Sequence, residues 1–117
     1  MSALDRAVAE LEAKRARDEA ERTARRQAAS AFLKAFYEAD IAPSRTLREH
    51  GVLAAFDGTR ILLQRPEEGV YAEGLMIVVG EQGEIDVSGR SLGPVGTGDA
   101  DAKKNELIAE IISHFSL

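Results

Sequence analysis

Residues 89–98, Gly-Arg-Ser-Leu-Gly-Pro-Val-Gly-Thr-Gly, are the part of the chain whose composition best suits phosphate binding. The backbone N–H groups of a glycine-rich loop can bind phosphate, most favourably where the loop leads into a helix. This segment lacks the Lys-Ser/Thr ending of a P-loop, and Asp99 and Asp101 follow it with negative charge. We therefore interpret residues 89–98 as a flexible linker to a helix that an Asp caps, and we predict no cofactor.

Acidic and imidazole side chains occur at helical spacing near the end of the chain, at Glu106, Glu110 and His114. Such groups can bind a metal ion. The first and last lie about 12 Å apart along a helix axis, so one ion cannot contact all three. The helix dipole explains His114 near the C-terminus of its helix, and His50 precedes Gly51 at the C-terminal cap of another. With two histidines and no cysteine, we predict no metal site and no catalytic residue, and hence a non-enzymatic protein.

Basic side chains gather between residues 14 and 26 and could contact nucleic-acid phosphates: Lys14, Arg15, Arg17, Arg22, Arg25 and Arg26. Asp18, Glu19 and Glu21 interrupt this cluster, which is typical of a solvated helix face with ion pairs. Arg22, Arg25 and Arg26 share one side of a helix, so a local contact with phosphate or with an acidic partner stays open. Residues 38–117 carry a net charge of −7, which argues against a nucleic-acid surface there.

A long helix is expected to position this basic cluster. Residues 3–40 contain no Gly and no Pro and are rich in Ala, Glu, Arg and Leu, which favour helix. Ser2 is a suitable N-cap, and Pro43 should end the helix because it lacks an N–H and restricts Ala42. Such a helix would be about 57 Å long, longer than a small domain is wide.

Alanines recur along this helix at steps of three or four: Ala9, Ala13, Ala16, Ala20, Ala24, Ala28, Ala31, Ala35 and Ala39. Larger apolar residues occur only at its two ends, at Leu4, Val8 and Leu11 and again from Phe32 to Tyr37. The middle is either a solvated helix held by propensity and charge pairs, or a surface that packs closely on another helix through its alanines. We predict partner-binding residues on this stretch: Ala13, Ala16, Ala20, Ala24, Arg22, Arg25 and Arg26.

After Pro43 the sequence indicates a short helix and then strands. Ser44–His50 forms the helix, which Ser44 caps and Gly51 ends. Four strands follow, separated by turns at Asp57-Gly58-Thr59, Pro66–Gly69 and Gly80–Gly83, with a bulge or bend expected at Gly74. Their expected ranges are Val52–Phe56, Arg60–Gln64, Val70–Val79 and Glu84–Ser88. A C-terminal helix of about Ala102–Phe115 completes an α+β fold, in which it packs on a four-stranded antiparallel meander.

Two of these strands are apolar on both faces, at Ile61-Leu62-Leu63 and at Leu75–Val79. In a small antiparallel sheet this pattern predicts that both faces are covered. The C-terminal helix can cover one face. We expect the other to be covered by the Phe32–Tyr37 end of the long helix or by a second subunit, and this is the main argument from the sequence for an oligomer.

We therefore divide the chain into an extended Ala/Arg/Glu-rich helix, residues 1–31, and a compact α+β domain, residues 32–117. The predicted function is that of a small interaction or adaptor protein. It would be homo-oligomeric, most simply a homodimer, and would use the long helix as a coiled coil to dimerise or to dock on a larger protein. The alternative is a nucleic-acid-associated regulator using the Arg-rich helix. No segment approaches the length of an apolar membrane span, and a cytoplasmic location is expected.

Overall fold

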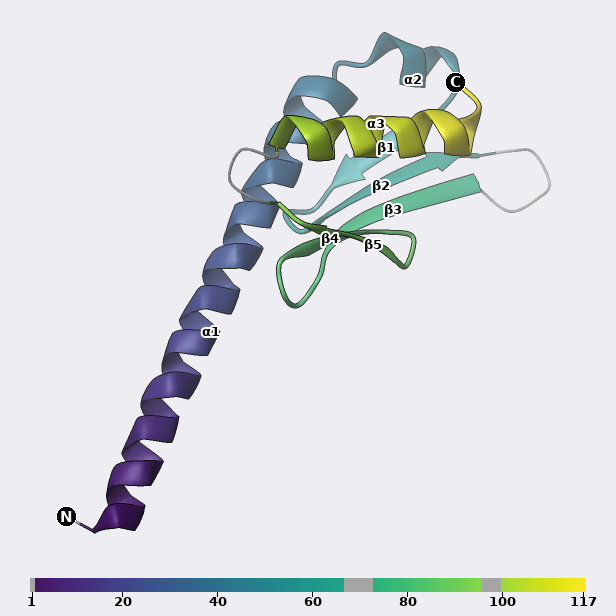
Figure 1. The fold of residues 1–117 in the computed structure, drawn as a ribbon. Helices are drawn as coiled ribbons and strands as arrows, with labels where there is room; N and C mark the ends of the chain where they lie inside the picture. Colours follow the sequence, from purple (N-terminus) through teal and green to yellow (C-terminus); the bar gives the residue numbers. More distant parts are fainter. Residues whose placement is uncertain (1, 67–72, 96–99) are drawn as a thin grey trace.

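The fold consists of one long helix, a five-stranded antiparallel sheet and a C-terminal helix (Figure 1). The computed structural model describes residues 2–66, 73–95 and 100–117. The sheet order follows the chain, β1-β2-β3-β4-β5. The elements are α1 (Ala3–Phe36), η1 (Tyr37–Ile41), α2 (Arg45–Glu49), β1 (Leu53–Phe56), β2 (Arg60–Arg65), β3 (Glu73–Val79), β4 (Glu84–Val87), β5 (Arg90–Pro94) and α3 (Ala100–Phe115). The predicted α+β class is confirmed, whereas the sheet has five strands and not four.

The long helix begins and ends close to where its sequence indicates. Ser2 Oγ accepts a hydrogen bond of 3.1 Å from Asp5 N and so caps α1. The helix then widens into the π-helical turn η1, and Ala42 N donates to Tyr37 O just before Pro43. The molecule measures 69 × 34 × 19 Å, and Figure 1 shows the N-terminal part of α1 projecting away from the sheet.

Two short-range signals in the sequence are also confirmed. Ser44 Oγ accepts a hydrogen bond from Leu47 N and caps α2, and Gly51 follows this helix with φ +71°. In the turn between β1 and β2, Gly58 has φ +100°. The preceding residue, Asp57, accepts hydrogen bonds from the backbone N–H groups of Thr59 and Arg60 through Oδ1, which fixes the hairpin.

The fifth strand lies inside the segment predicted to be a linker. Residues 88–89 form a turn in which both have positive φ, and β5 then pairs with β4 across an irregularity between Glu84 and Asp86. Of the bulge or bend expected at Gly74, the bulge is wrong, because Gly74 pairs with Gln64 in unbroken register. The predicted strand start at residues 70–72 and most of the turn at 66–69 lie outside the described residues. Of the two aspartates before the predicted C-terminal helix, Asp99 also lies outside them, and Asp101 lies in the first turn of α3.

One face of the sheet carries both helices. The side chains buried on this face alternate along β2, β3 and β4, and they form one core with three residues of α1 and three of α3. These core residues are Ile61, Leu63, Leu75, Ile77, Ile85, Val87, Ala29, Leu33, Phe36, Leu107, Ile111 and Phe115, and the same core includes Ile41, Leu47 and Val52. The expectation that the end of α1 covers the second face is therefore wrong. Alternation in a strand determines which residues share a face, but it does not determine on which face a helix packs.

Polar contacts attach α3 to the strands and to the end of the long helix. Lys103 is 8% exposed, and its Nζ donates a hydrogen bond to Leu92 O of β5. Arg65 of β2 donates to Phe115 O, and its guanidinium lies over the Phe115 ring. Lys104 Nζ lies 2.9 Å from Asp40 Oδ2 in η1. These contacts fix α3 across the helix-bearing face, and the opposite face has no helix among the described residues.

Candidate docking surfaces

Residues 3–21 of α1, which we call the arm, are exposed along their whole length. Within the arm, Leu4 is 72% exposed, Val8 45% and Leu11 46%. Single exposed apolar residues are common, but Leu4, Val8 and Leu11 follow the i, i+4, i+7 spacing that places side chains on one face of a helix. The arm thus presents a short apolar stripe to solvent.

The apolar stripe continues the face of α1 that packs on the sheet. At 3.6 residues per turn, positions 4, 8, 11, 15, 18, 22, 25, 29, 33 and 36 all fall on one side of the helix. Ala29, Leu33 and Phe36 on this side are buried in the core. Leu4 lies 25 residues before Ala29, which is about 37 Å along the axis. The same face is therefore apolar at both ends of α1 and polar in between.

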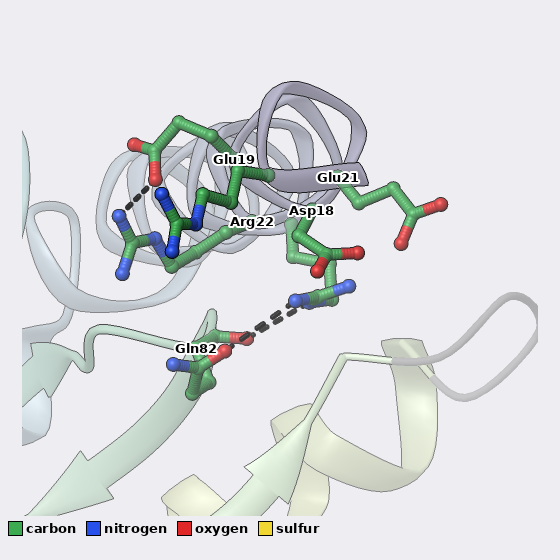
Figure 2. Close-up of a pocket in the computed structure, with 7 residues that line it drawn as sticks. Asp18, Glu19, Glu21, Arg22 and Gln82 are labelled. Carbon is green, nitrogen blue, oxygen red and sulfur yellow. Dashed lines mark hydrogen bonds and ion pairs between the residues drawn. The ribbon is translucent and has the colours of Figure 1, made fainter. Parts of the chain in front are cut away.

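Arg25, which follows the arm in α1, is hydrogen-bonded to the sheet. Its Nε donates to Gln82 O (3.2 Å) and its Nη2 to Gln82 Oε1 (3.4 Å), in the turn between β3 and β4 (Figure 2). Gly83 in this turn has φ +81°, and a Cβ there would lie 2.6 Å from Arg25 Cβ. Glycine is required at this position both for the backbone conformation and for the close approach of the helix.

A hollow of about 450 Å³ lies where α1 leaves the sheet. Figure 2 shows Glu19 and Arg22 joined in an ion pair at this site, with the Gln82 side chain facing the helix. Its lining consists of three arginines, three acidic residues and one amide: Arg15, Arg22, Arg25, Asp18, Glu19, Glu21 and Gln82. Because the charges balance, the hollow does not offer the concentrated positive potential that phosphate binding requires.

The partner-binding residues predicted from the sequence lie on two different sides of α1. Ala13, Ala16, Ala20 and Ala24 are turned by about 120–200° from the Leu4 direction and face away from the sheet. Arg22, Arg25 and Arg26 share one side of α1, as their spacing predicted, and this side is the one that faces the sheet. The alanines are all exposed, whereas Arg25 is hydrogen-bonded to Gln82. The two sets therefore cannot form a single docking surface.

The second face of the sheet, which the sequence pattern predicted to be covered, is a further candidate surface. Its apolar residues are Leu53 (63% exposed), Ala55, Leu62, Met76 (38% exposed) and Val78, and we call this set the open face. None of them belongs to the buried core. Part of it forms a hollow of about 270 Å³ that Asp57 and Arg60 border. The alternation of residues along the strands predicts which residues share this face, but it does not predict that the face is exposed.

Asp57 and Arg60 form a charged rim beside the open face. Arg60 Nε donates to Asp57 Oδ2 at 2.5 Å. The backbone N–H of Thr59 holds the pKa of Asp57 below its ordinary value of 3.8, and the hydrogen bonds from Arg60 add to this effect. These hydrogen bonds thus favour the charged form of the carboxylate.

A second apolar groove, of about 320 Å³, lies between α3 and the η1–α2 region. Its apolar lining is Ile41, Leu47, Ile108, Ile111, Ile112 and Leu117. Ile112 is 46% exposed on the outer side of α3, while Ile41 and Leu47 belong to the buried core. This groove is therefore largely the outer margin of the core.

The residues considered for metal or acid–base chemistry are engaged in separate contacts. Glu106 pairs with Lys103 at 3.5 Å, Glu110 pairs with Arg90 of β5, and the His114 ring packs edge-on against Phe115. His50 Nδ1 lies 2.9 Å from Thr46 O at the end of α2. Within residues 2–66, 73–95 and 100–117, no group of three or more His, Asp or Glu side chains is arranged to hold a metal ion.

Comparison with known proteins gives no relative: no family model, no curated protein and no solved structure matches this chain. Across the described part of the chain, no helix is both long enough and apolar enough to cross a membrane.

Proposed function

We propose that this chain is a non-enzymatic interaction or adaptor protein that uses its arm to dimerise or to dock on a larger protein partner. The observation that carries the proposal is the exposure of every residue of the arm, which includes three large apolar side chains on one face. A projecting helix with an apolar stripe matches the way amphipathic helices bind grooves or other helices.

The arm offers a partner two alternative sides. The apolar stripe of Leu4, Val8 and Leu11 would occupy a hydrophobic groove, whereas the alanine side would let another helix backbone approach closely. The charged residues between these sides, such as Glu10 and Lys14 at i, i+4, would keep the free arm helical and soluble. The nucleic-acid alternative has no specific support, because acidic residues alternate with the basic ones along the arm.

Site-specific photo-crosslinking in the full chain tests the proposal. A photoreactive residue is placed at Leu11 on the stripe, at Ala16 on the alanine side, or at the exposed control position Glu49 in α2. We expect crosslinks from one arm position and none from Glu49, with an adduct of twice 12.6 kDa if the partner is a second copy. Equal yields at all three positions, or none at any, would contradict docking through the arm.

A further inference from the structure

The open face of the sheet carries opposite charges on the two sides of its apolar centre. Arg60 of β2 and Asp86 of β4 both pair directly with Val78 of β3, so they lie at the same level along the strands. Both lie on the open face, because their neighbours Ile61 and Ile85 are fully buried on the other. Met76 and Val78 lie in the central strand between them.

We propose that two copies of this chain pair through their open faces, about a two-fold axis that runs close to the direction of β3. Such a rotation places β2 of one copy over β4 of the other, and it brings Met76 and Val78 onto their own counterparts. Arg60 of each copy then faces Asp86 of the other, which gives two equivalent ion pairs around an apolar centre. Sheets that pack face to face lie about 10 Å apart and about 30° from parallel, a geometry that long side chains near the axis can bridge.

The neighbouring charges are compatible with this arrangement. Arg60 already pairs with Asp57 in its own hairpin. In the dimer its guanidinium would lie between this carboxylate and that of Asp86 in the other copy. The Glu84 carboxylate is folded back over its own turn, where it accepts a hydrogen bond of 3.0 Å from Gln82 N. A two-fold axis perpendicular to the strands would instead place β2 over β2 and β4 over β4, and it would form no such pairs.

The size of the open face sets the expected strength of the dimer. Five strands about 4.8 Å apart and four residues of about 3.3 Å each cover roughly 300 Å² of flat area. A standard interface buries about 800 Å² on each partner. The dimer should therefore be weak and dependent on concentration, and the reciprocal ion pairs should contribute specificity more than affinity.

Charge reversal in the full chain tests the proposal by sedimentation equilibrium, up to about 1 mM, where a dimer with a Kd of about 1 mM is half formed. The variants are Arg60→Glu and Asp86→Arg. Each alone should weaken the wild-type dimer about ten-fold or more, because like charges then face each other twice. An equimolar mixture of the two variants should dimerise again, because both contacts become complementary in the heterodimer.

Circular dichroism and thermal unfolding establish that each variant is folded. Met76→Lys, which would place two ammonium groups at the two-fold axis, should also give a monomer. The proposal is wrong if the wild type is monomeric throughout, if the single reversals dimerise like the wild type, or if the mixture stays monomeric. None of these substitutions alters the arm. Variants of Leu4 and Leu11 should leave this dimer intact, so a failure here is distinguishable from a failure of the proposed docking through the arm.

Discussion

Gly83 shows how one residue fixes the direction of the long helix. Its turn lies against α1, and an added Cβ would be 2.6 Å from Arg25 Cβ and 2.8 Å from the Arg25 carbonyl carbon. Both of these atoms belong to rigid parts of the helix, so the helix or the turn would have to move. The Arg25–Gln82 hydrogen bonds depend on the same contact. The point at which α1 leaves the sheet is thus set by a residue that has no side chain.

Gly83→Ala should destabilise the fold more than the replacement of another glycine that has the same backbone strain but no close neighbour. The positive φ costs about 1–2 kcal/mol, and displacing the helix adds about 1–3 kcal/mol. Gly89→Ala is the matched control, since Gly89 has φ +88° and a Cβ added there would meet no atom of the described residues within 4 Å. Urea unfolding measures both free energies. Equal losses for the two variants would show that the contact with Arg25 is not tight.

Asp57 should contribute stability that depends on pH. Its folded pKa lies below 3.8, first because of the hydrogen bond from the Thr59 N–H. A carboxylate with a lowered pKa stabilises the fold fully above its unfolded pKa, and this contribution is lost as the pH falls through the folded pKa. Asp57→Asn should thus lower the melting temperature at neutral pH and make no difference in strong acid. A difference that stays constant over a pH series of thermal unfolding would contradict this assignment.

At the scale of elements, α1 is one helix whose two parts are stabilised in different ways. From Ala29 onward one side of it is buried in the core, whereas the arm depends on helix propensity, its Ser2 cap and charge pairs. Isolated helices of this length are marginal in water, so the arm should open locally without unfolding the sheet.

Paired glycine substitutions separate the two parts of α1. Ala16→Gly should cost about 1 kcal/mol of local helix stability, seen as lost helical circular dichroism and faster amide exchange in the arm, without a change in the urea midpoint. Ala29→Gly combines the same propensity loss with about 0.8 kcal/mol for a buried methyl group, and it should lower the midpoint. A shift of the midpoint by Ala16→Gly as well would indicate that the arm and the core unfold together.

Local signals in the sequence predicted most of the elements. The caps at Ser2 and Ser44 and the turn at Gly58 are short-range features, and the structure confirms them. β5 was missed because Gly89, Gly93 and Pro94 are typical of a loop, although strand pairing with β4 overrides that preference. The apolar stripe of the arm was readable at 3.6-residue spacing, but Arg15, Asp18 and Arg22 interrupt it and hide its continuity with the core.

The sequence patterns did not predict which face of the sheet the helices pack on. Leu62 and Met76 are apolar like their buried neighbours, so the pattern predicted a covered face, and the structure instead leaves Met76 38% exposed. Which face a helix selects depends on the contacts of the whole core, including Leu33 of α1 and Leu107 of α3, which are both fully buried. Exposure of the open face is thus a property of the assembled domain.

At the scale of the whole molecule, the proposed arm contact and the proposed sheet contact lie on different sides. The arm projects along the 69 Å axis, while the open face lies on the side of the sheet away from both helices. A dimer formed through the open faces would leave both arms free, so that one assembly would present two arms to a larger partner and gain avidity from their linkage.

Sedimentation equilibrium of the unmodified full chain tests most directly the central proposal that two copies of this chain associate. We predict a weight-average mass that rises with concentration from 12.6 kDa towards twice that value. A mass that stays at 12.6 kDa up to about 1 mM would exclude any dimer with a Kd of that order or tighter, and would contradict the claim that this chain associates with itself.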